Sequence, residues 1–355
     1  MAKVDVVVPC YNYGRFLTDC VRSVLDQSIR DVRVLIIDDA SSDSSVEIAN
    51  RLAAGDPRVQ VVAHASNKGH IATYNEGIEW AESDYFLLLS ADDFLTPGAL
   101  ERATAVMDSH PEVGLTYGEA VVWHRDRPRP EIEPDPTWLW SKQDLVADLC
   151  RTASDFIATP TAIARTSVQK TVGGYRPSLP HSGDLEMWLR FGAYGEVVRI
   201  DAVQAIYRKH SSAMSNSYLA EMLSEYRQRK AAFDSFFETC GSGVKNLALL
   251  KQEVSHSLAD QSFQTGINYL RRGRIKSGLE LLRWAMNLDR RLRYCPPFWR
   301  ILRMPGPEGR ARILSAVRSR AGYLVGRGRP DFERREFTGR REVASTALND
   351  QSDRP

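Results

Sequence analysis

The 355-residue sequence lacks the features that would place it in several large classes of protein. Its five cysteines lie far apart and form no Cys-x-x-Cys pair, which argues against a disulfide framework and against a zinc site. No apolar run approaches the ~20 residues that a membrane-spanning helix needs. No basic and then apolar leader precedes Val4, so we expect neither a signal peptide nor an integral membrane segment. The sequence therefore predicts a cytoplasmic protein.

Glycine-rich phosphate loops are missing as well. The chain has no Gly-x-x-x-x-Gly-Lys-Ser/Thr motif and no Gly-x-Gly-x-x-Gly motif after a predicted strand, which excludes phosphate binding by such a loop. What is present is the composition of an ordinary globular protein, with 43% hydrophobic and 26% charged residues. The length suits one large α/β domain with a smaller appendage, or two ordinary domains.

Charge is distributed unevenly along the chain. The net charge is +2, but 20 Lys and Arg face only 6 Asp and Glu between Arg271 and Arg341, while the remainder is acidic. Apolar and aromatic residues such as Trp284 and Trp299 interrupt this basic stretch, a mixture that suits contact with an anionic membrane. A solvated helical surface is an equally good interpretation. No nucleic-acid-binding module accompanies the charge, so we expect no nucleic-acid partner.

Short β-branched runs alternate with amphipathic helical stretches over the first 120 residues. This order predicts a parallel sheet with helices on both faces, because several of the runs are apolar throughout. The predicted strands are residues 4–9, 32–38, 59–63, 85–90 and 113–117.

Residues 124–140 break this rhythm with four prolines and mixed charge, so they are expected to form neither a central strand nor a helix. Beyond them the pattern predicts a helix near 141–150, a strand near 156–164, a helix near 184–194 and a strand near 197–200. From about residue 214 onward the pattern is helical, through 220–238, 247–272, 275–290 and 310–325.

Acidic residues gather where two predicted strands end. Asp38 and Asp39 close the second strand and Asp92 and Asp93 follow the fourth, at the edge where open α/β sheets bind ligands. A buried carboxylate pair is unfavourable unless a cation or a hydrogen-bonding ligand compensates it. Each pair alone is explained as well by a solvated turn or a helix cap. Two such pairs at neighbouring strand ends favour a ligand site.

Several stretches carry a resemblance to a known family. They are Val6-Val7-Val8-Pro9-Cys10-Tyr11-Asn12-Tyr13, Ile37-Asp38-Asp39-Ala40-Ser41-Ser42-Asp43, Asn67-Lys68-Gly69 with Asn75-x-Gly77, and Ala91-Asp92-Asp93-Phe94-Leu95-x-Pro97. In this order and spacing the chain resembles the family 2 glycosyltransferases over roughly residues 3–210. These are inverting, nucleotide-sugar-dependent enzymes of the GT-A fold.

The resemblance implies an α/β protein of the GT-A type with a mostly parallel central sheet. Residues 1–212 would form the catalytic domain, with a nucleotide-binding half over 1–120 and an acceptor half over 121–212. Beyond the region of resemblance, the residue pattern and the charge predict an all-α C-terminal extension, with a helical basic region over residues 213–340 and a disordered tail over residues 341–355.

The resemblance also implies which residues contact the nucleotide. Asp39 and Asp43 would hold the base, Pro9 and Tyr11 would wall its pocket, and Asp92 would bind the ribose or the sugar. The full set of implied nucleotide-binding residues is Pro9, Tyr11, Asn12, Asp38, Asp39, Asp43, Asn67, Gly69 and Asp92.

A divalent metal, Mg²⁺ or Mn²⁺, is the implied cofactor. A departing nucleoside diphosphate gains negative charge, which a hard cation held by carboxylates neutralises. Asp92 and Asp93 fill the place of the family's Asp-x-Asp motif, whose first aspartate is Ser90 here. Asp93 is the implied direct ligand, and His210, after Tyr207-Arg208-Lys209, is the implied second one.

The implied general base is Asp184, which follows the Gly173-Gly174-Tyr175 turn at the start of a predicted helix. Gly183 stands where the family often has Glu. The alternative is that Asp184 only caps the helix. Glu186 is the second candidate, although its position two residues further on turns it away by about 200°.

The predicted function is the transfer of one sugar from a nucleotide sugar to an acceptor hydroxyl, on a glycan or a lipid-linked acceptor in polysaccharide or glycoconjugate biosynthesis. We expect the enzyme in the cytoplasm or at the inner face of the membrane. The alternatives are a nucleotidyltransferase acting on sugar phosphates and a non-catalytic glycan- or lipid-binding scaffold of the same fold.

Overall fold

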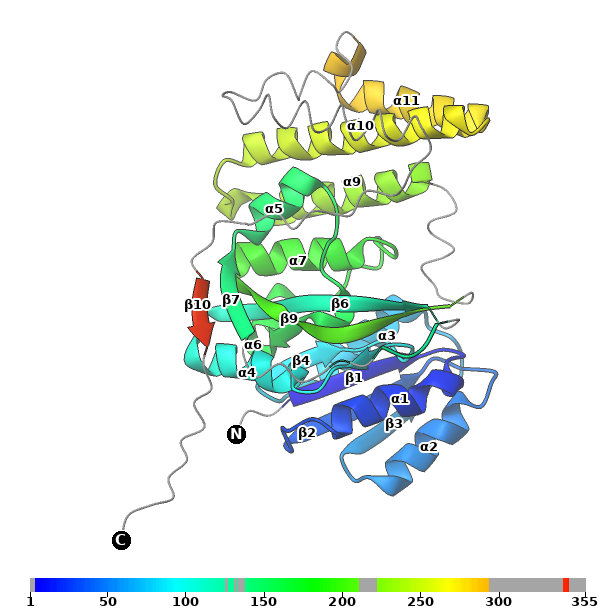
Figure 1. Cartoon of the computed structure of the whole chain (residues 1–355), viewed down its shortest axis with the longest axis vertical. Coiled ribbons are helices and arrows are strands. Elements are labelled where there is room, and N and C mark those ends of the chain that lie inside the picture. Colours follow the sequence, from blue (N-terminus) through cyan, green and yellow to red (C-terminus); the bar gives the residue numbers. More distant parts are fainter. Residues whose placement is uncertain are drawn as a thin grey trace. The chain divides into compact units, whose positions relative to one another are not determined.

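A computed structural model of the chain describes residues 4–124, 127–130, 132, 138–210, 222–293 and 341–344. The chain divides into two compact units, one from the N-terminus to Leu247 together with residues 339–355, and one over Ala248–Thr338. The predicted helix at 310–325 lies outside the described residues. The first unit holds all of the strands found among the described residues (Figure 1).

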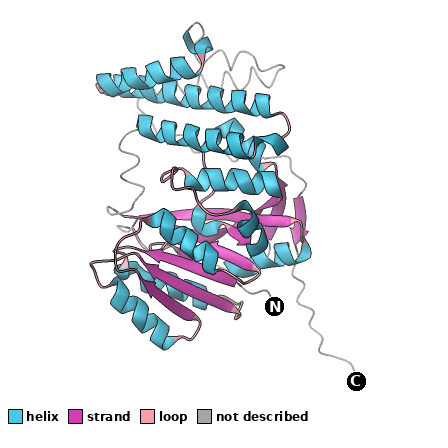
Figure 2. Ribbon diagram, turned by 180° about the vertical axis from the view of Figure 1, so that it is seen from behind, coloured by secondary structure: helices cyan, strands magenta, loops and turns pink. Residues whose placement is uncertain are grey.

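The N-terminal half of the first unit is the predicted parallel sheet. Strand β1 pairs in parallel with β2 on one side and with β4 on the other, and β2 pairs in parallel with β3. The elements are β1 (Val4–Cys10), α1 (Gly14–Leu25), β2 (Val32–Asp38), α2 (Ser45–Gly55), β3 (Val59–Ala63), α3 (His70–Trp80) and β4 (Tyr85–Leu88). Figure 2 shows these strands in magenta with the helices against them.

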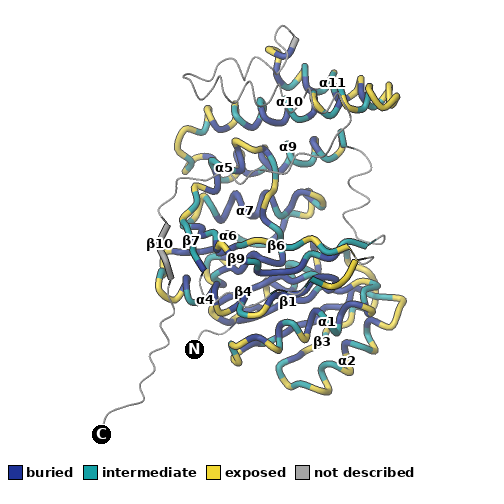
Figure 3. The backbone as a smooth tube through the Cα atoms, in the orientation of Figure 1, coloured by how far each residue is buried: buried dark blue, intermediate teal, exposed yellow. Residues whose placement is uncertain are grey.

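Helices cover both faces of β1 because its side chains alternate between two apolar layers. Val6 and Val8 pack in one core cluster with Leu17 of α1. Val7 points to the other face, where Gly77 of α3 comes so close that a Cβ atom there would lie 2.4 Å from the Val7 Cγ1 atom. This packing appears in Figure 3 as a dark blue sheet interior.

The second half of the unit is mixed. Strand β8 is antiparallel to both β4 and β6, while β6 and β9 are parallel. The two-residue strand β5 pairs with β9. The elements are β5 (Phe94–Leu95), α4 (Ala99–Ser109), β6 (Val113–His124), β7 (Trp138–Gln143), α5 (Leu145–Thr152), η1 (Thr159–Thr161), β8 (Ile163–Arg165), α6 (Thr166–Val172), α7 (Gly183–Tyr194), β9 (Glu196–Lys209), α9 (Met222–Thr239) and η2 (Gly241–Gly243).

Four predictions for this half need correction. Strand β9 reaches Lys209, well beyond residue 200, because it pairs with β5, β6 and β7. Residues 138–143 form β7, since Trp138 and Trp140 lie beyond the prolines and point into the core. Helix α5 accordingly begins only after Asp144, whose side chain accepts a hydrogen bond from the Ala147 N–H. Of residues 156–164, only Ile163 and Ala164 are in a strand, because the turn η1 contains Pro160.

Residues 341–344 form strand β10 (Arg341–Ala344) in the stretch predicted to be disordered. It runs antiparallel to β7, which otherwise ends that side of the described sheet. An unpaired strand edge offers backbone donors and acceptors to any segment that reaches it.

The second unit contains a helical hairpin made by α10 (Leu247–Arg271) and α11 (Ile275–Leu288), followed by η3 (Arg290–Arg293). Gly266 and Gly278 let the two backbones approach, and the Ser262 Oγ atom donates a hydrogen bond of 3.0 Å to the Leu281 carbonyl. Among the described residues, no helix is both long and apolar enough to cross a membrane.

Asp5 anchors the amino-terminal end of the sheet. Its buried carboxylate accepts hydrogen bonds of 2.7 and 2.6 Å from the Arg33 guanidinium and bonds from the backbone N–H groups of Glu82 and Ser83. Burial by itself raises the pKa of Asp5, but these hydrogen bonds outweigh it and lower the pKa below its usual value. The carboxylate is therefore structural and lies opposite the edge where ligands are expected.

We predict that Asp5→Asn lowers the free energy of unfolding by about 3 kcal/mol at neutral pH, the scale of removing one partner of a buried pair. Because the pKa of Asp5 is lowered by folding, its contribution is present above the pKa of the unfolded chain and is lost as the pH falls through the folded value. Urea denaturation across an acidic pH series should show a flatter profile for the variant. Asp56→Asn, which breaks a surface pair with Arg58, is the control and should cost less than ~1 kcal/mol. Equal losses would contradict the anchoring role.

Candidate functional site

The loops after β1 and β2 are bound to each other at the carboxyl end of the sheet. Asn12, which has a positive φ of 59°, donates its backbone N–H to the Ser41 Oγ atom at 2.8 Å. Its side-chain oxygen accepts the Ser42 N–H at 2.8 Å. The Asp43 carboxylate accepts the Gly14 N–H at 3.2 Å and the Ser45 N–H at 2.9 Å. In this structure Asn12 and Asp43 therefore hold the loop framework together.

Pro9, Tyr11 and Asp38 lie in the same framework. The Tyr11 side chain is half exposed, as a ring that walls a ligand pocket would be. The Asp38 Oδ1 atom accepts the Ser41 N–H at 2.9 Å, and its Oδ2 atom is buried without a hydrogen-bond partner. Asp38 thus shapes the turn that carries Asp39.

Both oxygens of the Asp39 carboxylate have hydrogen-bond partners. Its Oδ1 atom lies 2.7 Å from the Lys68 backbone nitrogen and 2.8 Å from the His64 Nδ1 atom, and its Oδ2 atom accepts the Gly69 N–H at 2.9 Å. Asn67 donates its side-chain N–H to the Asp39 carbonyl at 3.1 Å. Burial by itself raises the pKa of Asp39, but the bonds from His64, Lys68 and Gly69 outweigh it and lower the pKa. The carboxylate is held ionised.

His64 and Glu76 are functional candidates that sequence reasoning missed. The His64 ring is buried, and its Nε2 atom lies 3.0 Å from the Glu76 Oε2 atom on α3. The available signal was a histidine directly after the strand predicted at 59–63, at the same edge as the acidic residues.

Asp92 and Asp93 are buried directly before β5. The Asp92 Oδ2 atom lies 3.0 Å from the His210 Nε2 atom, and its Oδ1 atom accepts the Ser90 hydroxyl at 2.5 Å. Asp93 accepts the Arg208 backbone N–H at 2.8 Å. Burial, and then the charge of Asp92, raises the pKa of Asp93 well above its usual range, against the effect of Arg208. The long strand β9 thus brings two predicted residues, His210 and Asp92, into direct contact.

Arg208 supplies a buried positive charge beside this pair. Its guanidinium carbon lies 4.6 Å from the Phe16 ring centroid, 5.0 Å from that of Trp123 and 5.3 Å from that of Phe94. One of its nitrogens contacts the Asp19 carboxylate on α1 at 3.3 Å. Aromatic faces stabilise a cation without neutralising it, so Arg208 remains a source of positive potential.

The chemistry of these side chains fits a divalent metal only in part. Two carboxylates and an imidazole converge, and oxygen and nitrogen donors of this kind suit Mg²⁺ and Mn²⁺. Within the described residues, however, no three His, Cys, Asp or Glu side chains form a group that could hold a metal ion by themselves. A diphosphate ligand would have to complete the coordination.

Asp184 stands at the second position of α7, where the sequence predicts a base. Its Oδ2 atom accepts the Thr159 hydroxyl at 3.0 Å, and the hydroxyl of the buried Tyr175 bonds to the same carboxylate. Burial, the largest influence, raises the pKa of Asp184 although Tyr175, Thr159 and the charge of His70 oppose it. A carboxylate with a raised pKa accepts a proton more readily than an ordinary aspartate.

Asp184 is connected through Thr159 to elements near the acidic pair. Its partner Thr159 belongs to η1, which packs against β5 and against β9. Strand β5 follows Asp93 directly, and β9 carries Arg208. The element that bonds to Asp184 therefore contacts the two strands next to the acidic pair.

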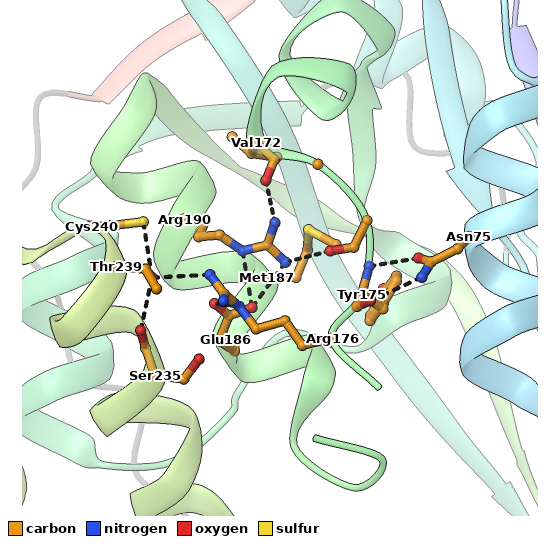
Figure 4. Close-up of polar contacts among 12 residues, drawn as sticks. Asn75, Val172, Tyr175, Arg176, Glu186, Met187, Arg190, Ser235, Thr239 and Cys240 are labelled. Atoms are coloured by element: carbon orange, nitrogen blue, oxygen red, sulfur yellow. Dashed lines mark hydrogen bonds and ion pairs between the residues drawn. The ribbon is translucent and has the colours of Figure 1, made fainter. Parts of the chain in front are cut away.

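Glu186 is excluded as the base by its surroundings. It is fully buried, and it accepts hydrogen bonds of 2.6 Å from Arg176 and 2.9 Å from Arg190. Arg190 also donates to the carbonyl of Val172, as Figure 4 shows, and to the carbonyl of Gly174. This ion pair cluster fixes the turn that leads to Tyr175, whose backbone is bonded in turn to the Asn75 side chain.

Comparison with known proteins gives a family match over part of the chain. Residues 5–172 match the family model described as glycosyl transferase family 2. An uncharacterized glycosyltransferase of Haemophilus influenzae is 35% identical over 102 residues, or 29% of this chain and 41% of the relative. Glycosyltransferase GlyG of Streptococcus pneumoniae is 36% identical over 99 residues, or 28% of this chain and 33% of the relative. Each match thus spans less than half of the relative's length.

Solved structures share the fold. Staphylococcus aureus TarS 1-349 in complex with UDP-GlcNAc is 18% identical, with a TM-score of 0.52 over 81% of this chain and 92% of that one. A mannosyltransferase from Pyrobaculum calidifontis in complex with GDP-Man and Mn²⁺ is 12% identical, with a TM-score of 0.53 over 91% of this chain and 80% of that one. At these identities the likeness shows the fold alone, and it confirms the predicted GT-A type.

Glu186→Gln should lower the free energy of unfolding by about 3–5 kcal/mol, because it leaves the buried Arg190 guanidinium without its counter-charge. Chemical denaturation measures this loss. Glu47→Gln, which breaks an exposed pair with Arg51, is the control and should change stability by less than ~1 kcal/mol. A Glu186→Gln protein that is fully stable but inactive would show instead that Glu186 acts on the substrate.

Proposed function

Because residues 5–172 match the model of glycosyl transferase family 2, we propose that the chain is an inverting glycosyltransferase that moves one sugar from a nucleotide diphosphate sugar to an acceptor hydroxyl. The observation that carries this proposal is the set of contacts that links Asp184, through Thr159 and η1, to the strands β5 and β9 next to the Asp92–Asp93 pair. In the proposed reaction, Asp184 would take the proton of the acceptor hydroxyl, and the carboxylate pair would serve the departing diphosphate.

The donor would lie along the carboxyl edge of the sheet. Asp39 would accept a hydrogen bond from the base, with Pro9 and Tyr11 beside it, and Asn67 and Gly69 would line the nucleotide. Asp92 would bind the ribose or the sugar. Support comes from the fixed, ionised Asp39 and from the half-exposed Tyr11 ring.

Asp93, His210 and the phosphate oxygens would hold Mg²⁺ or Mn²⁺. When bound, the metal would neutralise charge on the departing diphosphate. Arg208 would add positive potential from its aromatic surroundings without contacting the ion. On the acceptor side Asp184 would take the hydroxyl proton, while Thr159 and Tyr175 would orient its carboxylate.

The two other functions fit the structure less well. A nucleotidyltransferase would use a basic, glycine-rich loop after its first strand, whereas the loop here is Tyr11-Asn12-Tyr13 and is bonded to Ser41 and Ser42. A non-catalytic scaffold would have no need of a base with a raised pKa next to buried carboxylates. An assay of donor hydrolysis with and without metal separates the scaffold from the enzyme.

Asp184→Asn should reduce turnover by roughly 10²-fold or more while the dissociation constant of the donor stays nearly unchanged. In the wild type, turnover should fall on the acid side at a pH above the usual range of aspartate, because the pKa of Asp184 is raised. Steady-state kinetics across pH measure both effects. Asp155→Asn removes a nearby carboxylate and should keep most of the turnover. Equal loss of donor affinity and turnover in Asp184→Asn would mean that Asp184 is structural.

Asp93→Asn should abolish transfer and weaken nucleoside diphosphate binding when Mn²⁺ is present, since the diphosphate loses its counter-charge. Calorimetric titration with and without EDTA measures the metal-dependent part of the affinity. Asp19→Asn, which touches Arg208 but not the acidic pair, should leave that metal-dependent part intact. Wild-type activity in EDTA would rule the proposal out.

The basic C-terminal region would hold the enzyme at an anionic membrane that carries a lipid-linked acceptor. Helix α11 supports this because Ile275 and Leu279 are about half exposed on it, next to the exposed Arg274 and Lys276.

Co-sedimentation with anionic vesicles tests the membrane contact. The full chain should bind in a salt-sensitive way, and a chain carrying both Ile275→Glu and Leu279→Glu should bind several-fold more weakly, because the apolar anchor is lost. Leu249→Glu, at a similarly exposed position of α10, should bind like the wild type. Equal binding by all three proteins would contradict the role of α11.

A further inference from the structure

A buried imidazole separates two carboxylates behind the proposed nucleotide site. The His64 ring is only 3% exposed, with its Nδ1 atom 2.8 Å from Asp39 Oδ1 and its Nε2 atom 3.0 Å from Glu76 Oε2. Lys68 places its ammonium 3.0 Å from the same Glu76 oxygen. The three partners come from the loop after β2, from α3 and from the loop before α3, so the arrangement is tertiary rather than local.

This geometry requires two N–H groups on the ring. A neutral imidazole has one N–H and one acceptor nitrogen, so it would set two acceptors against each other at either Asp39 or Glu76. A protonated Glu76 would relieve the conflict, but Lys68 places its ammonium on the same oxygen and, against the effect of burial, helps to lower the pKa of Glu76. The titratable groups that face the ring are Asp39, Glu76 and, across Glu76, Lys68. A ring with an N–H group on each nitrogen would satisfy both carboxylates at once.

The hydrogen bonds that Asp39 already accepts leave its Oδ2 atom with the capacity for one more. A carboxylate oxygen accepts about two hydrogen bonds. The Oδ1 atom already receives the Lys68 N–H and the His64 ring, whereas the Oδ2 atom receives only the Gly69 N–H. A base that offers one N–H, as uracil and thymine do at N3, matches this capacity. Guanine offers two adjacent N–H groups, at N1 and N2, and needs both carboxylate oxygens.

We propose that His64 is a positioning residue that sets nucleotide specificity: as an imidazolium between Asp39 and Glu76 it saturates the Asp39 Oδ1 atom, so that the site selects UDP or dTDP over GDP. This inference rests on the proposed function, in which Asp39 receives the base. His64 itself contacts neither the donor nor the acceptor.

Calorimetric titration of the full chain with UDP, dTDP and GDP in the presence of Mg²⁺ tests the specificity. UDP and GDP share the same ribose diphosphate, so the difference between their affinities isolates the base. UDP and dTDP should bind at least ~10-fold more tightly than GDP, because an unpaired N–H group in a closed site is unfavourable. Equal affinity for UDP and GDP would overturn the inference while leaving a nucleotide-sugar enzyme. Failure of all three nucleotides to bind would contradict the proposed function itself.

Two variants distinguish a positioning role of His64 from a general effect of this network on the stability of the protein. His64→Ala frees the Oδ1 atom for the second N–H group of guanine, so the preference for UDP over GDP should narrow to within ~3-fold, mostly through tighter GDP binding. Lys68→Met removes an ammonium from the same network but keeps the backbone N–H on Asp39, and it should preserve the preference. A His64→Ala protein that keeps the preference, or a Lys68→Met protein that loses it equally, would overturn the role of His64.

The protonation state is measured without any ligand and without a variant. Nitrogen NMR of the full chain labelled at histidine should show imidazolium shifts at both ring nitrogens of His64 at neutral pH. Nitrogen shifts of a neutral ring there would overturn the proposed imidazolium between Asp39 and Glu76, whichever nucleotide binds.

Discussion

Burial of carboxylates at one edge of the sheet is the constraint on which the site depends. Asp38, Asp39, Asp92 and Asp93 are all less than a tenth exposed, and carboxylates in such surroundings must be neutralised or hydrogen-bonded. Asp39 is satisfied by backbone N–H groups and by His64, so it is rigid before any ligand arrives. Asp93 accepts only the Arg208 N–H among the described residues, and burial together with the charge of Asp92 raises its pKa. In the proposed function, Asp39 would bind the base and Asp93 would bind the cation.

The carboxylates near the candidate base Asp184 are neutralised in a different way. There the buried Glu186 is matched by Arg176 and Arg190, and this cluster holds the turn through Gly174 that brings Tyr175 to Asp184. Glu186, whose carboxylate is paired with two guanidinium groups, holds the local structure, and Asp184 is the candidate base. At the opposite end of the sheet Asp5 follows the same rule, since its full set of partners marks it as structural.

Local patterns were sufficient for the N-terminal half of the fold and insufficient for the rest. Apolar runs predicted β1, β2 and β4 because these strands are buried along nearly their whole length, and β3 is more exposed but rich in valine. The reach of β9 to Lys209 could not be predicted, because polar residues such as Asp201 and Gln204 interrupt its pattern and its pairing with β5 is set by a distant segment. That pairing is what brings His210 to Asp92. The candidates His64 and Glu76 were missed because their contacts are made between separate loops and α3, although a histidine directly after the strand predicted at 59–63 was a local signal.

The most direct test of the account is a proton NMR time course of sugar transfer, started from a nucleotide sugar with Mn²⁺ and the full chain. A direct displacement with Asp184 as the base predicts that the first product formed has the anomeric configuration opposite to that of the donor. A product that retains the donor configuration would contradict the proposed geometry, because one base and one leaving-group site on opposite sides of the sugar permit only inversion.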